Sequence, residues 1–206
     1  MPINVLQQQR RAYEVGRIRI GVQIPIEGKP GRTRPSKLGV FRFTSRDEYA
    51  IRAVGALYNG EVKRWEGAPT DDQWEVITTE REIGVSVPPG PQSVSQWMEM
   101  WSGGGCARRC DGDVEQLTRR PCMCPADQEE RNELAKDGKA CKPTTRVSLM
   151  LPDIPGLGVW RLESHGWNAA HELGGTAEFL ARVRDAVGAA WIPAVLRLEK
   201  RKVVSR

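Results

Sequence analysis

The stretch Arg17–Pro25, RIRIGVQIP, decides the fold because apolar and polar residues alternate along it. A period of two is typical of a strand that buries one face. Leu38–Thr44 alternates again, after a basic loop rich in glycine and proline at Glu27–Ser36. The two stretches predict strands on either side of that loop.

Working outward, Ser45 is expected to cap a helix, with Glu48 three residues later completing a capping box. A helical stripe runs to about Tyr58, where Asn59 and Gly60 stop it. Further strands are expected at Glu61–Trp65, Trp74–Thr78, Ile83–Val87, Arg146–Leu151, Gly158–Leu162 and Ala194–Leu198. Further helices are expected at Ser93–Trp101, Ala126–Asp137 and Thr176–Val187, the last capped by Thr176.

These elements predict an α+β fold, a strand-rich mixed domain with two or three helices and an irregular cysteine-rich, metal-binding insertion. Residues 1–102 form the strand-rich N-terminal part of a single domain. Residues 103–145 form the zinc-binding insertion, and residues 146–206 supply the C-terminal strands and helix that complete the same domain.

Composition excludes several classes of protein. The chain has 206 residues, of which 39% are hydrophobic, and its mean hydropathy of −0.49 is that of a soluble globular protein. No apolar stretch approaches the roughly 20 residues of a membrane span, and the N-terminus lacks the apolar core of a signal peptide. A reducing cytoplasm is the expected setting, where cysteines serve as thiols or metal ligands.

The net charge of +5 is unevenly distributed. Residues 1–46 carry ten Lys and Arg against two acidic residues, and the last twelve residues carry a net +4. The segment between them is therefore acidic. Basic ends suggest a polyanion or an acidic protein surface as partner, although solvated arginines that keep the protein soluble give the same pattern.

The five cysteines fall within 36 residues and suggest a metal site. Four thiolates can hold a tetrahedral structural zinc, an iron–sulfur cluster uses the same ligands, and buried thiols without metal are the third possibility. Four ligands are expected, namely Cys106, Cys110, Cys141 and one of Cys122 and Cys124. Cys124 is preferred over Cys122 because Pro125 follows it. Cationic Arg108, Arg109 and Lys142 would offset the thiolate charge. The candidate ligands are Cys106, Cys110, Cys122, Cys124 and Cys141.

Catalysis is not expected. The chain has two histidines, and the nearest candidate pair is Ser164 with His165. Adjacent residues on a strand point to opposite faces, so this pair lacks the geometry of a nucleophile and its base. Trp97 and Trp101, expected on one face of a helix, are instead the candidate anchors for a partner protein, with burial in the core as the alternative.

Four blocks of sequence together resemble a known family. They are FRFTS at Phe41–Ser45, SGGGCARRCDG at Ser102–Gly112, GKACKPTTR at Gly138–Arg146 and LPDIPGLGVWRLESHG at Leu151–Gly166. These blocks are similar to the gene-3-type recombination directionality factors of actinobacterial phages that use large serine integrases.

The resemblance runs from about Arg17 to Leu198 and implies a non-enzymatic cytoplasmic protein of the host bacterial cell. Such a factor binds the coiled-coil region of the integrase and switches recombination from integration to prophage excision, contacting DNA through the integrase complex. The family supplies no catalytic residue. Trp97, Trp101, Arg32 and Arg34 are the expected partner-binding residues.

Two alternatives remain at this point. One is a zinc-stabilised nucleic-acid-binding accessory protein of phage replication or repair, favoured by the basic N-terminal part. The other is a metal-dependent hydrolase, which needs an open coordination position that all-thiolate sites usually lack.

Overall fold

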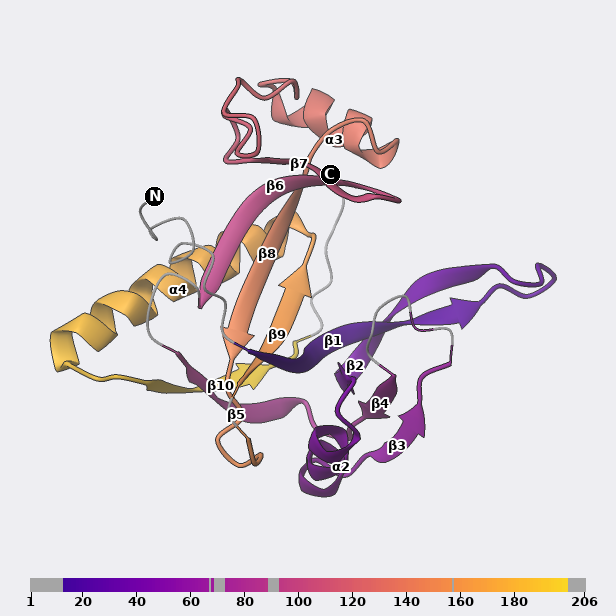
Figure 1. Cartoon of the computed structure of the whole chain (residues 1–206), viewed down its shortest axis with the longest axis vertical. Helices are drawn as coiled ribbons and strands as arrows, with labels where there is room; N and C mark the ends of the chain where they lie inside the picture. The colour runs from indigo at the N-terminus through magenta and orange to yellow at the C-terminus, as the bar shows by residue number, and fades with distance from the viewer. Residues whose placement is uncertain (1–12, 67, 69–72, 89–92, 157, 200–206) are drawn as a thin grey trace, which may run out of the picture. The chain divides into compact units, whose positions relative to one another are not determined.

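The computed structural model describes residues 13–66, 68, 73–88, 93–156 and 158–199. Within them the chain forms ten strands and three helices (Figure 1). Two compact units can be distinguished. The first comprises Met1–Pro88, Ser148–Leu162 and Trp191–Arg206, and the second comprises Pro89–Val147 and Glu163–Ala190.

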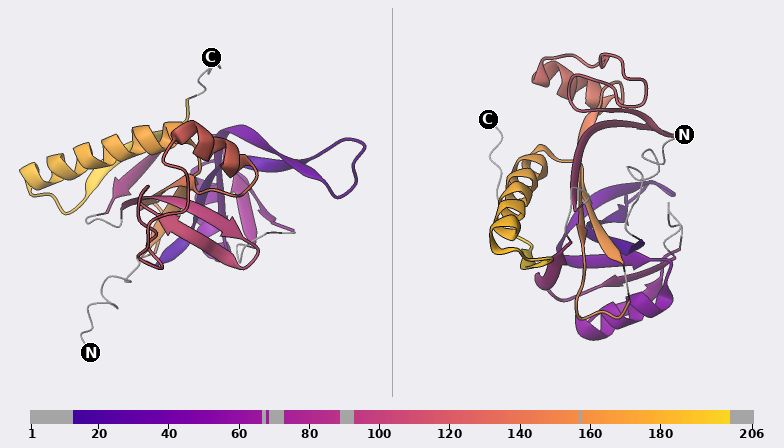
Figure 2. Two further views of the ribbon diagram at one scale, coloured as in Figure 1. Left: turned by 90° about the horizontal axis from the view of Figure 1, so that it is seen from above. Right: turned by 60° about the vertical axis from the view of Figure 1, so that its left-hand side comes forward.

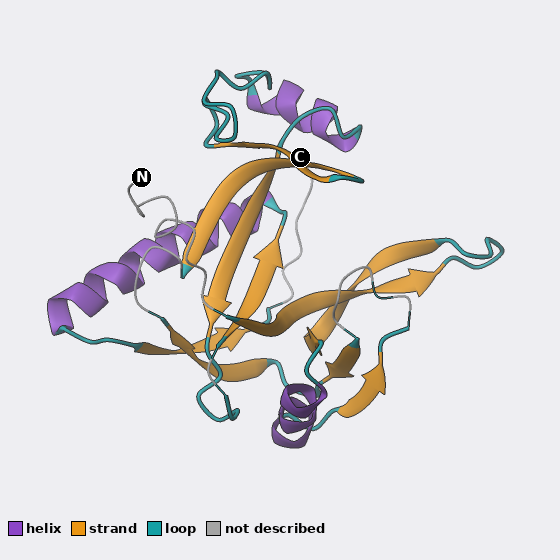
Figure 3. Ribbon diagram, viewed as in Figure 1, coloured by secondary structure: helices purple, strands orange, loops and turns teal. Residues whose placement is uncertain are grey.

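The first unit is organised around β1 (Glu14–Pro25), the strand expected from the alternating stretch. It pairs antiparallel with β2 (Thr33–Ser45) and parallel with β9 (Val159–Ser164). On its other side β2 pairs with β4 (Trp74–Ile77). The strand order is β3-β4-β2-β1-β9, with β3 at Glu61–Arg64. The sheet is therefore mixed, and the strand-rich α+β fold class is confirmed (Figure 3).

Helix α2 (Glu48–Leu57) follows β2, but its cap differs from the expected one. Asp47 is the N-cap, and its carboxylate accepts a hydrogen bond from Ala50 N at 3.2 Å. Ser45 is the last residue of β2 instead, and its buried hydroxyl donates to the carbonyl of Val15. A serine engaged in a sheet contact cannot also cap the helix.

The core of the first unit is apolar. Phe43, Ile51, Val54 and Val76 are fully buried between α2 and the sheet. The ring of Phe43 meets Trp160 edge-on, with the ring centroids 5.4 Å apart. These contacts explain why α2 presents one apolar face to β2 and β4.

A second, two-stranded sheet belongs to the same unit. β5 (Glu82–Val87) pairs antiparallel with β10 (Ile192–Arg197). Backbone hydrogen bonds between Ser86 and Met150 attach β5 to the segment that follows β8. Residues from the middle and the end of the chain thus complete a unit that begins with β1.

The second unit contains β6 (Val94–Ser102), which lies between β7 (Gly105–Cys110) and β8 (Lys142–Leu149). The prediction of a helix at Ser93–Trp101 is wrong. The backbone of this segment pairs antiparallel with both neighbours, and these ladders satisfy the groups that a helix would have bonded internally.

Two helices complete the second unit. α3 (Gln128–Lys136) is capped by Asp127 and confirms the charged helix expected there. α4 (Trp167–Val187) begins nearer to the strand than expected, because Gly166 is its N-cap. Thr176 lies inside α4, where its hydroxyl bonds the Glu172 carbonyl at 2.8 Å, so it is not a cap. None of the described helices is long and apolar enough to cross a membrane.

Candidate metal centre

The register of β6 brings the two ends of the cysteine segment together. Met98 of β6 lies opposite Cys110, the last residue of β7, and opposite Pro143, near the start of β8. The chain therefore leaves the sheet at Cys110 and re-enters it just after Cys141 at the same point along β6. Residues 111–140 form the loop and helix between these two cysteines.

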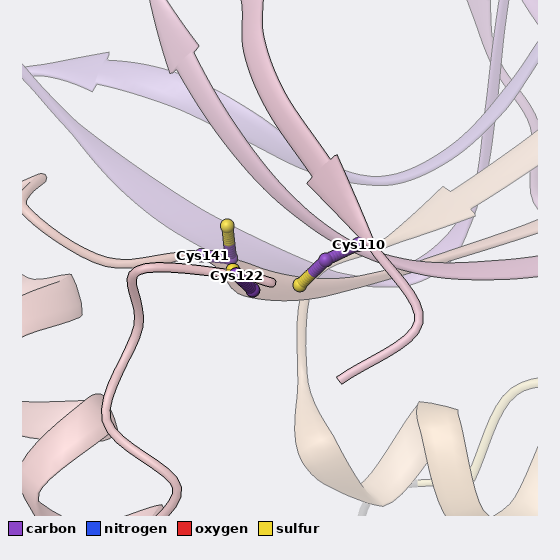
Figure 4. Close-up of side chains that lie close together, drawn as sticks. All are labelled: Cys110, Cys122 and Cys141. Atoms are coloured by element: carbon purple, nitrogen blue, oxygen red, sulfur yellow. The ribbon is translucent and has the colours of Figure 1, made fainter. Parts of the chain in front are cut away.

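Three thiols converge at this point. The sulfurs of Cys110, Cys122 and Cys141 lie within 4.8 Å of one another (Figure 4). Cys110 and Cys141 are buried, and they share a small cluster with Met98. Cys124 packs against the same cluster, and its sulfur accepts a hydrogen bond from Cys141 N at 3.2 Å.

A buried carboxylate shapes the loop that carries Cys122. The side chain of Glu115 accepts hydrogen bonds from Arg109 N, Leu117 N and Thr118 N. A side-chain hydrogen bond with Thr118, together with these backbone bonds, lowers the pKa of Glu115 to about 2, although desolvation opposes the shift. The loop is held further by a backbone bond from Cys122 N to the Asp113 carbonyl at 2.6 Å. Hydrogen bonds within the loop therefore position Cys122, which also packs against the buried cluster of Met98, Cys110 and Cys141.

Helix α3 closes the loop from the other side. Arg131, which is buried, donates to the carbonyls of Pro125 and Gly112 at 2.8 and 3.1 Å. Asn132 accepts a hydrogen bond from the indole N–H of Trp167 at 2.8 Å, which fixes α3 to the start of α4. The segment between Cys110 and Cys141 is consequently folded and not a free loop.

The four thiols fit a soft, thiolate-binding metal ion. Burial raises the pKa of Cys110 to about 11 and raises that of Cys141 as well. For Cys122 the hydrogen bonds from its cysteine neighbours outweigh burial and lower the pKa. Buried thiols that hold their protons bind a metal only by releasing those protons, so occupancy depends on pH.

The separations also suit such an ion. Zinc–sulfur bonds of about 2.3 Å in a tetrahedron require sulfurs about 3.8 Å apart, which the three thiols reach by closing in by at most about 1 Å. The guanidinium of Arg108 lies 3.9 Å from the Cys124 sulfur and would offset thiolate charge. The cysteine cluster of Cys110, Cys122, Cys124 and Cys141 could therefore hold a metal.

Cys106, a further candidate ligand, is not among the thiols that converge. It lies in β7 opposite Trp101, and its thiol contacts the Arg108 carbonyl at 3.2 Å. Burial and the negative charge of Glu99 raise the pKa of Cys106. The structure thus separates this cysteine from the other four.

A buried ion network, which sequence reasoning missed, joins β6, β7 and β8. The fully buried carboxylate of Glu99 accepts hydrogen bonds from Arg109 Nε at 2.7 Å and from both terminal nitrogens of Arg146 at 2.9 and 2.6 Å. Burial would raise the pKa of Glu99, but the two arginines outweigh it and lower the pKa. The available signal was a single carboxylate within the apolar run Trp97–Trp101.

The same network extends to His165. Arg146 Nε donates to Glu163 at 2.6 Å, and Glu163 lies 3.2 Å from His165 Nε2. The other ring nitrogen of His165 is 3.2 Å from the hydroxyl of Thr144. The hydroxyl of Thr144, the ring of His165 and the carboxylate of Glu163 follow the order of a nucleophile, base and acid. Thr144 is only 1% exposed, however, so its hydroxyl is shielded from any substrate.

The candidate partner-binding residues occupy two strands and a loop. Trp97 is half-buried, whereas Trp101 is 54% exposed and donates its indole N–H to Glu99 at 3.0 Å. Arg32 and Arg34 are exposed near the tip of the β1–β2 hairpin. Trp101 and the two arginines are therefore accessible.

Comparison with known proteins identifies the family. A family model for Gp3-like proteins, described as recombination directionality factor-like, matches residues 15–206. No solved structure matches the chain. The match includes the β1–β2 hairpin and all five cysteines, and it confirms the resemblance that the sequence blocks indicated. The chain therefore belongs to the Gp3-like family of recombination directionality factor-like proteins.

Proposed function

We propose that this protein binds a phage-encoded large serine integrase and switches site-specific recombination from integration to prophage excision. The observation that carries the proposal is the family match over residues 15–206, which supports the role of a recombination directionality factor. The protein acts by binding and catalyses no reaction of its own.

The switch is a shift in populations. An integrase bound to DNA adopts alternative synaptic arrangements, and a factor that binds one of them more tightly favours it by the difference in binding free energy. A difference of about 3 kcal/mol changes the preference about a hundredfold. Such coupling requires a rigid factor that presents one binding surface. It does not require a reactive group on the factor.

The cysteine cluster supplies part of that rigidity. Zinc, held by Cys110, Cys122, Cys124 and Cys141, would be a structural ion that fixes the loop of the second unit to the end of β7 and the start of β8. Four protein ligands leave no open coordination position for a substrate or water, which disfavours a metal-dependent hydrolase. Arg108 beside Cys124 supports a thiolate site.

Trp101 is the proposed anchor for the integrase. Its ring is largely exposed, yet its indole N–H is fixed by Glu99, which is itself held by two arginines. An aromatic side chain held in one orientation loses little entropy on binding, as is common at interface hot spots. Trp97 lies on the same strand and is less accessible.

Recombination with purified integrase tests the function. Supercoiled substrates carry either the phage and host attachment sites or the two hybrid sites, and the factor is added at increasing concentration. We expect excision to rise and integration to fall, together with a complex of factor and integrase in gel filtration without DNA. Unchanged rates of both reactions with the cognate integrase would disprove the proposal.

Two variants sharpen this experiment. Trp101→Ala should weaken the complex at least tenfold, whereas Trp191→Ala, which removes another exposed indole in the first unit, should leave it unchanged. If the two substitutions weakened the complex equally, Trp101 would not be the residue that anchors the integrase.

A further inference from the structure

The β1–β2 hairpin continues beyond the sheet as a two-stranded ribbon. β9 pairs with β1 only along Glu14–Ile18, and β4 pairs with β2 only along Arg42–Ser45. Within the described residues, Gly21–Lys37 pair with one another alone. This segment, called here the hairpin arm, extends past β3, β4 and α2 of its own unit (Figures 1 and 2).

The hairpin arm is strongly basic. It carries four cationic side chains and a single acidic one, Glu27, and all five are exposed. None of the four cations has an ion pair or a side-chain hydrogen bond with the described residues, whereas Arg17 and Arg42 of the same strands pair with Glu14 and Glu75. The four are Lys29, Arg32, Arg34 and Lys37.

The register places these cations on more than one side of the ribbon. Arg34 lies opposite Ile24, and the Arg32 carbonyl bonds Ile26 N, so Arg32 and Arg34 share one face about 6.7 Å apart. Lys37, an odd number of residues away, points to the other face. Lys29 lies in the turn. The ribbon therefore presents cations on both faces and at its tip.

The backbone of the arm is built for close packing and twist. A β-bulge between Arg19 and Gly21 interrupts the ladder at its base, and bulges increase the local twist. A Cβ at Gly21 would come within 2.9 Å of the Ser36 carbonyl oxygen, so glycine is required there. Gly28 and Gly31 turn the chain at the tip with φ of 72° each.

Folding does not explain the arm. A two-stranded hairpin is marginally stable by itself, and unpaired cations so close together repel one another. These features suit a polyanion instead. A two-stranded β-ribbon fits the major groove of duplex DNA, and cations on both faces suit a ribbon that lies between two rows of phosphates.

We propose that the hairpin arm binds the phosphates of duplex DNA directly and without sequence readout. The proposal goes beyond the binding of an integrase and does not depend on it. An acidic surface of the integrase is the competing partner, because Arg32 and Arg34 are also the charges expected to steer that complex.

Fluorescence anisotropy with the full chain tests the proposal. The probe is a labelled 30-base-pair duplex of arbitrary sequence, titrated at several salt concentrations. Each phosphate contact contributes about 0.9 to the slope of log K against log salt. Arg32→Ala/Arg34→Ala should lower the slope by about 1.8, which corresponds to about 60-fold weaker binding in 0.1 M salt.

The matched control is Arg52→Ala/Lys136→Ala. It removes the same charge from two exposed side chains that are already paired with Glu48 and Glu133, and it should retain the wild-type slope. The melting temperatures of both variants should equal that of the wild type, because all the altered side chains are exposed.

Three results would overturn the proposal. The wild type could fail to bind the duplex in 50 mM salt, or both double variants could give the same slope. In the third result, the Arg32→Ala/Arg34→Ala variant would retain the wild-type slope of log K against log salt for DNA binding. It would, however, no longer form a complex with the integrase in the absence of DNA. That result would assign the arm to the acidic protein surface.

Discussion

In the first unit Phe41, Phe43 and Ile51 are fully buried, whereas in the second unit the fully buried side chains include the carboxylate of Glu99 and the thiol of Cys110. The first interior is stabilised by removal of apolar surface from water. The second relies on ion pairs and on thiols that could hold a metal.

This difference has a physical consequence. Apolar packing responds little to pH or to metal concentration, whereas a site of buried thiols and carboxylates responds to both. Under changed solution conditions the second unit should therefore open before the first. Hydrogen exchange resolves the two, because it reports the opening free energy of each segment separately.

The largest effect is expected at the cysteine cluster. Cys110→Ser should abolish metal binding and destabilise the second unit by several kcal/mol, because structural zinc sites contribute on the order of 10 kcal/mol to folding. Elemental analysis should find one zinc per chain in the wild type and none in the variant, and hydrogen exchange should accelerate in β6–β8 but not in β1.

Cys106→Ser is the matched control for this prediction. Cys106 lies outside the group of converging thiols, so the variant should retain its zinc and its exchange rates. Loss of zinc from the control, iron in place of zinc, or metal-free protein that is folded and active would contradict the proposed zinc site.

A somewhat smaller effect is expected from the apolar core. Phe43→Ala should destabilise the first unit by about 4 kcal/mol, since it removes a fully buried ring and leaves a cavity. The loss of stability can be measured by urea denaturation, monitored through hydrogen exchange in β2. A chelator should not change its value. A strong dependence on chelator would show that the two interiors are not independent.

The buried ion network should rank third. Arg146→Met leaves the carboxylate of Glu99 with one arginine in place of two, and we expect the second unit to lose about 3 kcal/mol. Arg197→Met, which breaks an exposed pair with Glu82, should cost less than about 1 kcal/mol. Urea denaturation of both variants tests this order. Equal losses of unfolding free energy in the two variants would contradict a stabilising role of the buried network.

The smallest effect concerns pH. Burial of Glu163 opposes its ionisation, but His165 and Arg146 outweigh burial and lower its pKa to about 2. A depressed pKa stabilises the folded state above the ordinary carboxylate pKa, and this contribution disappears as the pH falls from about 5 towards 2. Glu163→Gln should flatten the acid branch of the stability curve of the second unit, measured by exchange at several pH values. Parallel curves for wild type and variant would contradict this.

The first unit was largely predictable from sequence because its signals are local. Alternation gave β1 and β2, and the stop at Asn59 and Gly60 gave the end of α2. The left-handed conformation of Asn59, with φ of 53°, is the reason that this pair ends the helix. The cap was misassigned because the role of Ser45 is decided by its contact with Val15 in another strand. The expected loop was also too long, since Thr33–Ser36 belong to β2.

The second unit was less predictable because its determinants are distant in sequence. In β6 the spacing of Val94, Trp97 and Trp101 imitates a helix, and Glu99 interrupts the apolar pattern of a strand. Its partner Arg146 lies in β8, and no local rule reveals that pairing. Clustering of the cysteines predicted a metal site, but the register of β6 determines which thiols converge.

The discontinuous course of the first unit has a consequence for synthesis. While the chain emerges from the ribosome, β1 lacks β9 and β5 lacks β10, the last strand described. Both strands must wait with unpaired edges, which favours slow folding and aggregation. Leu198 N bonds the Arg81 carbonyl only after β10 has been synthesised. A nascent chain stalled before that residue would expose β5, so yield in recombinant expression should depend on chaperones more than the size of the protein suggests.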